Sequence, residues 1–446
     1  MSDLWDGLSP WTQDALWLLA LLLPALVTGV VVLRGLRPWP LVRAMLWRFR
    51  GVNALFVLLI AVAVGLGIAL LAQERGLRAG TAAAADKFDM VVGAPGSEMT
   101  LLFAAVYLQP SDVGLLSGAA FDEIASHPSV SLAAPLGFGD SFAGAPVVGT
   151  VADFVHHLGE GRIEGRIFKT SGEAVAGALA PVGLGERFEP THGMGDLATE
   201  ADNLHAHAGA GFEVVGRLPP TGTPWDRALI VPIEAVWEVH GLANGHAPDP
   251  ADPGAATRIG PPFDAAYFPG TPAVVVRSET LWANYALRQA FTRDAEMMAF
   301  FPGAVLAQLY RVMGDVRQAM SAMAMVCQVL VAASVLTGLM ILIRLFRRQL
   351  ALLRALGAPG RFVLAVVWSY AATLLACGGM LGLVLGWQAA GIFSRLLSRR
   401  MDIAISAPLA WPELHVLAAF MGLASLLALV PALAMRRGSI TEALRS

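Results

Sequence analysis

The chain has 446 residues, of which 56% are hydrophobic and only 15% are charged. Soluble globular proteins carry roughly 25% charged residues, so this composition and a mean hydropathy of +0.61 indicate an integral membrane protein. The same figures exclude a disordered chain and a nucleic-acid-binding chain. Residues 73–315 carry 28 Asp/Glu against 14 Lys/Arg, while the rest of the chain carries 6 against 17. The acidic residues therefore lie in one block. The sequence has two cysteines, Cys327 and Cys377, and both lie outside this block, so the block has no disulfide framework.

Five uncharged apolar runs are long enough to cross a bilayer, which takes about 20 helical residues. The residues before the first run include Asp3, Asp6 and Asp14 and no Lys or Arg, which is not the basic start of a signal peptide. We therefore expect the first run to be a retained span.

Orientation follows from the arginines. Five lie between the first two runs, five between the third and fourth, and three after the fifth, and all are expected in the cytoplasm. Arg395, Arg399 and Arg400 depart from this rule. The predicted order is an extracytoplasmic N-terminus (1–14), an extra span (15–34), a cytoplasmic loop (35–50), a span (51–72), an ectodomain (73–315), a span (316–343), a second cytoplasmic loop (344–361), a span (362–390), an external loop (391–412), a span (413–435) and a cytoplasmic tail (436–446).

The predicted spans contain almost no ionisable residue, whereas ion-coupled carriers normally place carboxylates or broken helices at mid-membrane. The fourth span instead carries Gly378, Gly382 and Gly386 at four-residue spacing, which lets helix backbones approach closely. Packing within one chain and a dimer seam explain this spacing equally well.

Within 73–315, short apolar segments alternate with Gly and Pro, a pattern typical of an α+β domain. The fold class is therefore a helical membrane bundle of about five spans with a large extracytoplasmic α+β domain between spans two and three. Strands are predicted at 88–92, 130–135, 146–150, 212–215, 228–231 and 273–277, and helices at 119–126, 233–240 and 279–293.

Enzyme motifs are missing from the sequence. It has no GxxxxGK[ST] phosphate loop and no HExxH zinc motif. The segment 139–143 lacks the second glycine of a nucleophile elbow, so we interpret Ser141 as a turn residue. Two predicted cytoplasmic segments are more informative. Residues 350–361 form a short amphipathic helix stopped by Gly357, with Pro359 opening the next helix, and Ser439 with Glu442 forms a capping box near the C-terminus.

The chain resembles the FtsX/MacB-like permeases, membrane subunits of ABC transporters of the mechanotransmission type. The resemblance covers roughly residues 43–446 and rests on Arg354-Ala-Leu-Gly-Ala358, the glycine-rich fourth span and the terminal 431–445 pattern. Three ectodomain phrases agree with it: Pro146-Val-Val-Gly-Thr150, Gly172-Glu-Ala-Val175 and Phe212-Glu-Val-Val-Gly-Arg217. The usual member has four spans, so the first span is a departure.

The resemblance implies a homodimer in the bacterial inner membrane, bound to two cytoplasmic ABC ATPase subunits that supply ATP hydrolysis, so this chain is not itself expected to be an enzyme. It implies a MacB-like periplasmic core domain with an inserted subdomain near 156–245. It further implies that the domain handles a lipid, peptide, drug or periplasmic protein outside the bilayer, and no nucleic acid. The expected ATPase-coupling residues are Leu350, Leu353, Arg354, Leu356, Gly357 and Arg361. The alternative from another class is a membrane-anchored sensor or regulator that transports nothing.

Three histidines in the ectodomain, His192, His205 and His207, accompany three carboxylates in the same stretch. Imidazole and carboxylate suit zinc, so a zinc site is one hypothesis. A solvated loop whose histidines bind nothing is the other, because the spacing of structural zinc sites is missing.

Overall fold

The computed structural model describes residue 5 and residues 7–192, 211–248, 258–293, 296–312, 347–430 and 432–433, with isolated positions between 314 and 340. The chain divides into two compact units. The helical unit comprises Met1–Leu77, Asp315–Leu396 and Ser406–Ser446, and the α+β unit comprises Arg78–Gly314 and Leu397–Ile405.

Among the described residues, three helices are long and apolar enough to cross a membrane: α2 (Pro10–Leu33), α4 (Arg50–Ala85) and α12 (Gly360–Met401). They contain the first, second and fourth predicted spans. The fifth corresponds to the shorter apolar helix α13 (Trp411–Leu427). Most of the third predicted span lies outside the described residues.

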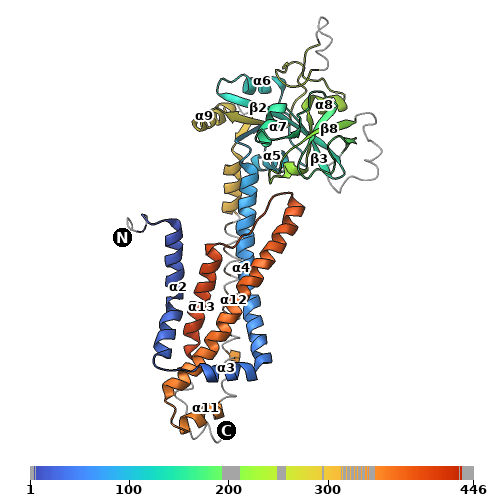
Figure 1. Cartoon of the computed structure of the whole chain (residues 1–446). Coiled ribbons are helices and arrows are strands. Elements are labelled where there is room, and N and C mark those ends of the chain that lie inside the picture. The colour runs from blue at the N-terminus through green and yellow to red at the C-terminus, as the bar shows by residue number, and fades with distance from the viewer. Residues whose placement is uncertain are drawn as a thin grey trace. The chain divides into compact units, whose positions relative to one another are not determined.

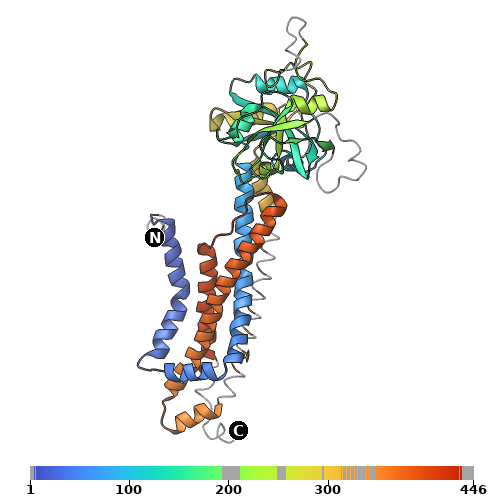
Figure 2. The same ribbon diagram turned by 45° about the vertical axis from the view of Figure 1, so that its right-hand side comes forward.

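Two short helices lie at one end of the helical unit. Helix α3 (Trp39–Arg48) runs across the ends of the long helices, and α11 (Arg347–Ala355) lies at the same end (Figures 1 and 2). The first two arginine-rich loops of the sequence are therefore on one side of the helical unit, as the positive-inside rule requires of loops that share a compartment.

The extra helix α2 is packed along α13. Gly422 allows this close approach, because a Cβ there would lie 2.3 Å from the backbone oxygen of Leu21. The Thr28 and Ser425 hydroxyls are 3.5 Å apart on the same two helices. Helix α2 also meets α12, where Gly29 faces the Trp368 ring. The departure from the four-span pattern is thus an integral part of this bundle.

The described strands of the α+β unit form one mixed sheet in the order β11-β1-β10-β2-β3-β9-β5-β8-β4, with β6 beside β8 and β7 beside β2. Pairing is antiparallel except for β3 with β9 and β5 with β8. The strand bounds are β1 Met90–Gly93, β2 Val130–Phe142, β3 Ala145–Thr150, β4 Glu164–Gly165, β5 Glu173–Ala176, β6 Arg187–Phe188, β7 Thr191–His192, β8 Phe212–Arg217, β9 Leu229–Pro232, β10 Ala273–Ser278 and β11 Met298–Phe300.

The sheet and the helices that pack on it form two separate hydrophobic cores. One core joins β1, β10 and β11 to the flanking helices through Phe121, Trp237 and Phe291. The other joins β3, β5, β8 and β9 through small side chains and Phe212. The segment 156–245, predicted as an inserted subdomain, supplies strands to the second core. Its strands β7 and β9 are hydrogen-bonded to β2 and β3, so the segment is part of the same sheet. The helices are α5 Glu98–Ala105, α6 Gly118–Ala125, α7 Ala152–Leu158, α8 Ile233–Val239 and α9 Leu281–Phe291, with a 3₁₀ turn at Pro224–Arg227.

Each predicted strand and helix of the α+β unit overlaps an observed one of the same type. Ser141 is a correction. It lies inside β2, nearly buried and paired with Pro146, and is not a turn residue. Strand β2 continues past Pro135 with a bulge near Gly139, where φ is +154°, and a glycine accommodates that conformation without strain.

Candidate functional site

The sequence motif at 350–361 forms a helix, a sharp corner and a second helix. Helix α11 ends because Gly357 adopts a left-handed conformation, with φ +97°, which favours glycine. The amide of Ala358 donates to the Leu353 carbonyl at 3.0 Å and closes the corner. Helix α12 begins at Gly360, and the amide of Phe362 donates to the Pro359 carbonyl at 2.8 Å. The chain therefore reverses from α11 into α12 within a few residues.

The leucines of α11 point to two different sides. Leu350 is 2% exposed and belongs to the core of the helical unit, and Leu353 packs against the same core. Leu352 and Leu356 are exposed, at 48% and 85%. Of the predicted coupling leucines, Leu353 therefore faces the core and Leu356 faces away from it. Leu352 and Leu356, four residues apart, form the exposed ridge.

The remaining predicted coupling residues surround this ridge. Gly357 and Arg361 are exposed, and Arg354 is half-buried on α11. An apolar ridge next to positive charge can bury its leucines in a partner whose surface is apolar and acidic. The capping box of Ser439 and Glu442 lies outside the described residues.

Helix α12 is held against α4 by its glycine stripe. A Cβ at Gly378 would lie 2.6 Å from the Ile60 Cβ, and one at Gly382 2.8 Å from the Val64 Cβ. At Gly386 a Cβ would lie 2.6 Å from the backbone oxygen of Gly65, so none of these three glycines can be replaced by a larger residue without a shift of the helices. These three predicted packing residues contact a helix of the same chain.

The far end of α12 enters the α+β unit. Asp402, directly after the helix, has φ +53°, which turns the chain away from the helix direction. Its two carboxylate oxygens lie 3.1 and 3.2 Å from Nη1 of Arg227. Two residues later, the amide of Ala404 donates to the Gly222 carbonyl at 3.0 Å. The segment after α12 is thus fastened by one ion pair and one backbone hydrogen bond.

The loop that contacts this segment is held by internal hydrogen bonds. The Asp226 carboxylate is buried and accepts hydrogen bonds from the amides of Thr221 and Gly222, at 2.7 and 2.8 Å. The neighbouring Trp225 is fully buried. Gly222 and Arg227 flank this carboxylate-bound turn, so the segment after α12 contacts a loop that has its own internal hydrogen bonds.

A buried acidic group that the sequence analysis did not single out lies in the same unit. Glu234 at the start of α8 is 1% exposed, and its Oε1 accepts from the amide of Gly260 at 2.5 Å. Its Oε1 lies 3.7 Å from Nε2 of the buried His246. Burial raises the pKa of Glu234 to about 7, and burial together with the charge of Arg258 lowers the pKa of His246. A Glu on the first turn of a helix gave no signal of burial.

Most of the predicted zinc site falls outside the described residues. His192 ends β7, and His205 and His207 lie outside the described part of the chain. No group of three or more metal-ligating side chains occurs among the residues that the structure describes.

Comparison with known proteins bears on the helical unit. Residues 321–442 match the family model of the FtsX-like permease C-terminal domain. No curated protein matches the sequence. Among solved structures, the periplasmic region of MacB from Actinobacillus actinomycetemcomitans is similar at 9% identity and a TM-score of 0.29, over 50% of this chain and 95% of that chain. The matched residues contain α11, the corner at Gly357 and the glycine stripe of α12, so this part of the chain is similar to the C-terminal domain of FtsX-like permeases.

Proposed function

We propose that this chain is the permease subunit of an ABC transporter and passes motion from a separate ATPase to its own α+β domain. In this proposal α11 is the contact for the ATPase in the cytoplasm, and the α+β domain works in the periplasm. The chain needs a separate ATPase because its sequence has no phosphate-binding loop.

The observation that carries the proposal is the continuity of α12. One helix of 42 residues begins three residues after the corner at Gly357 and ends one residue before Asp402. At 1.5 Å per residue such a helix is about 60 Å long, which exceeds the roughly 30 Å hydrocarbon core of a bilayer. A continuous hydrogen-bonded helix moves as a stiff body, so a push at α11 reaches the Arg227 contact.

A path for a solute is poorly supported by the same helices. Between 51 and 73, and between 362 and 394, the sequence contains no Asp, Glu, Lys or Arg. Polar and ionisable groups inside membranes mark ion and substrate pathways. Apolar helices together with a large polar domain are better suited to a protein that acts on its substrate outside the bilayer than to one that conducts a solute through it.

A dimer of two copies with two ATPase subunits in the bacterial inner membrane follows from the family resemblance. The glycine stripe of α12 does not support a dimer contact, since α4 of the same chain packs against these glycines. A lipid, peptide or drug-like molecule is the proposed class of cargo, exported or extracted from the outer face of the bilayer.

The test is a pull-down of the tagged full chain from native membranes, followed by measurement of ATP hydrolysis. We expect an ABC ATPase to co-purify with the wild-type chain, and the chain freed of that ATPase to hydrolyse no ATP. The double variant Leu352→Asp, Leu356→Asp should insert normally but lose the ATPase. A chain that binds no ATPase under any of these conditions would favour the sensor or regulator instead.

A further inference from the structure

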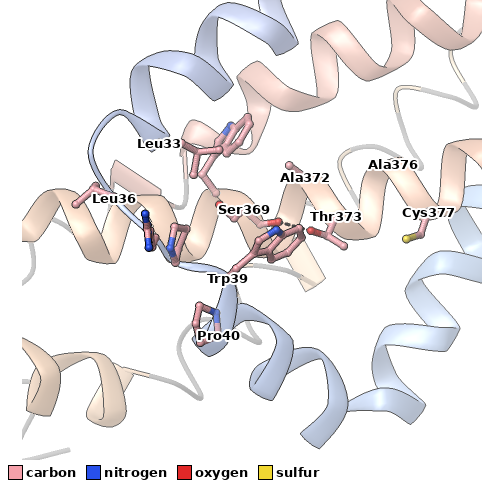
Figure 3. Close-up of a pocket in the computed structure, with 12 residues that line it drawn as sticks. Leu33, Leu36, Trp39, Pro40, Ser369, Ala372, Thr373, Ala376 and Cys377 are labelled. Atoms are coloured by element: carbon pink, nitrogen blue, oxygen red, sulfur yellow. Dashed lines mark hydrogen bonds between the residues drawn. The ribbon is translucent and has the colours of Figure 1, made fainter.

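A cavity of about 810 Å³ opens on the helical unit near the arginine-rich end, within the 300–1,000 Å³ typical of sites for small ligands. It lies between the end of α2, the link to α3 and the N-terminal half of α12 (Figure 3). Its lining includes Leu33 and Leu36 from the first helix and link, Trp39 from α3, and Ala372 and Ala376 from α12. Two of the three walls therefore depend on the extra helix and its link.

The walls of the cavity are fixed by contacts on their outer sides. The indole Nε1 of Trp368 donates to the Ser425 carbonyl at 3.1 Å, which orients that ring. A Cβ at Gly29 of α2 would lie 3.2 Å from the same ring. The cavity is thus bounded by a held aromatic ring and not by a side chain that could rotate to fill it.

Among the described residues, one buried hydroxyl in the lining has no hydrogen-bond partner. Ser369 is 7% exposed, and its hydroxyl makes no hydrogen bond within the described part of the chain. One turn further, the Thr373 hydroxyl donates to the Ser369 carbonyl at 2.7 Å, so Thr373 does not supply the missing partner (Figure 3). A buried hydroxyl without a hydrogen bond costs free energy unless a ligand completes it.

The charged residue among the lining residues described is an arginine. Arg37 lines it from the link between α2 and α3 and is exposed, and Trp39 beside it is 61% exposed. Arginine and tryptophan at the end of a membrane helix lie at the level of the lipid headgroups. Ser369 and Cys377 are eight residues apart on α12, about 12 Å along the helix, so the cavity runs from that level into the apolar core.

We propose that this cavity binds one anionic phospholipid of the surrounding bilayer. The phosphate pairs with the guanidinium of Arg37, the Ser369 hydroxyl donates to an ester oxygen of the lipid, and an acyl chain lies along Ala372, Ala376 and Cys377. This lipid fills a gap that the extra helix creates and ties α2 and α3 to α12. The proposal requires only that the helical unit lies in a bilayer and is independent of ATPase coupling.

Lipid retention by the purified full chain tests this directly. Phosphatidylglycerol and phosphatidylcholine of equal chain length are added in detergent, and native mass spectrometry counts the retained molecules. We expect one retained phosphatidylglycerol per chain, favoured about fivefold over phosphatidylcholine, since one arginine near an anionic headgroup contributes about 1 kcal/mol. The variant Arg37→Ala should remove this preference, while Arg43→Ala, an exposed arginine of α3 outside the cavity, should keep it. Equal retention of both lipids by the wild type, or loss of preference in both variants, would overturn the proposal.

A second variant tests the apolar half of the cavity. Ala376→Phe places a ring in the proposed path of the acyl chain and should reduce retention of both lipids at least about fivefold. Ser369→Ala should also lower retention of both lipids, by roughly two- to tenfold, since one hydrogen bond to the lipid is lost. Unchanged retention in Ala376→Phe would exclude this cavity as the lipid site. A lower stability of this variant could not produce that result, because it would reduce retention.

The native Cys377 distinguishes a lipid from a second copy of the chain. In the variant Cys327→Ser it is the remaining cysteine of the sequence. In nanodiscs, N-ethylmaleimide should modify Cys377 more slowly with phosphatidylglycerol than with phosphatidylcholine. Efficient cross-linking of two chains through Cys377 would instead show that another copy covers the cavity, and would contradict the proposal.

Discussion

The ion pair between Arg227 and Asp402 gives a sharp prediction about how α12 is fastened to the α+β unit. The perturbation is Asp402→Asn, which removes the charge but keeps a residue that tolerates the left-handed conformation at φ +53°. The carboxylate lies 3.1 Å from the guanidinium, and the two side chains are 35% and 27% exposed. We therefore expect the segment after α12 to detach more easily.

The magnitude follows from this partial burial. Exposed ion pairs contribute about 0.2–1 kcal/mol, and hydrogen bonds to charged groups contribute about 1.5–3 kcal/mol. A half-exposed pair with two contacts falls between these ranges, at about 1–2 kcal/mol. Local opening of the segment should then become about five- to thirtyfold more frequent.

Hydrogen exchange of the full chain in nanodiscs measures this opening at one amide. The Ala404 amide donates to the Gly222 carbonyl, so its protection reports attachment. The control is Glu213→Gln, which breaks the more exposed pair with Arg187 on the same sheet and should leave Ala404 unchanged. Protection of Ala404 that stays within twofold of wild type in Asp402→Asn would refute the reasoning.

Three further predictions concern α11, the glycine stripe and the buried carboxyl. Leu356→Asp should weaken ATPase binding about tenfold or more, because burying one leucine contributes about 1.5–3 kcal/mol, and a binding assay on the purified complex that finds unchanged affinity would exclude the ridge as the contact. Gly386→Ala should lower stability by about 1–3 kcal/mol through overpacking against Gly65, whereas Gly391→Ala, with open space around it inside the same helix, should leave stability unchanged or raise it by up to about 1 kcal/mol in the same thermal denaturation. Glu234→Gln should stabilise the α+β unit at pH 8, by up to about 3 kcal/mol, and hardly at pH 5. The folded-state pKa of about 7 lies above the ordinary 4.5, so the wild type loses stability as pH rises between these values, and a variant whose stability followed the same pH curve would contradict this.

Local patterns predicted the elements of the fold because each depends on a few neighbouring residues. Apolar runs bounded by Gly or Pro gave β3 and β9, and the stop signal at Gly357 gave the corner after α11. The extension of β2 through Ser141 was missed, since Pro135 and Gly139 interrupt the pattern and only the pairing with β3 sustains the strand.

Properties that depend on distant partners could not be predicted from local pattern. The leucines of α11 occur on several sides of the helix, and only the surrounding core decides that Leu353 is packed and Leu356 exposed. The pair of Arg227 and Asp402 joins residues 175 positions apart, and neither has a local signal. The parallel pairing of β3 with β9 likewise follows from the whole sheet order.

The most direct test of the central claim compares the segment after α12 in the presence and absence of nucleotide. The full chain is reconstituted with its co-purified ATPase, and hydrogen exchange of the Ala404 amide is measured without nucleotide and with a non-hydrolysable ATP analogue. Transmission through α12 predicts a change in Ala404 protection on adding the analogue, and the loss of that change in Leu352→Asp, Leu356→Asp. An ATPase that binds the chain and the analogue while Ala404 protection stays the same would contradict the account.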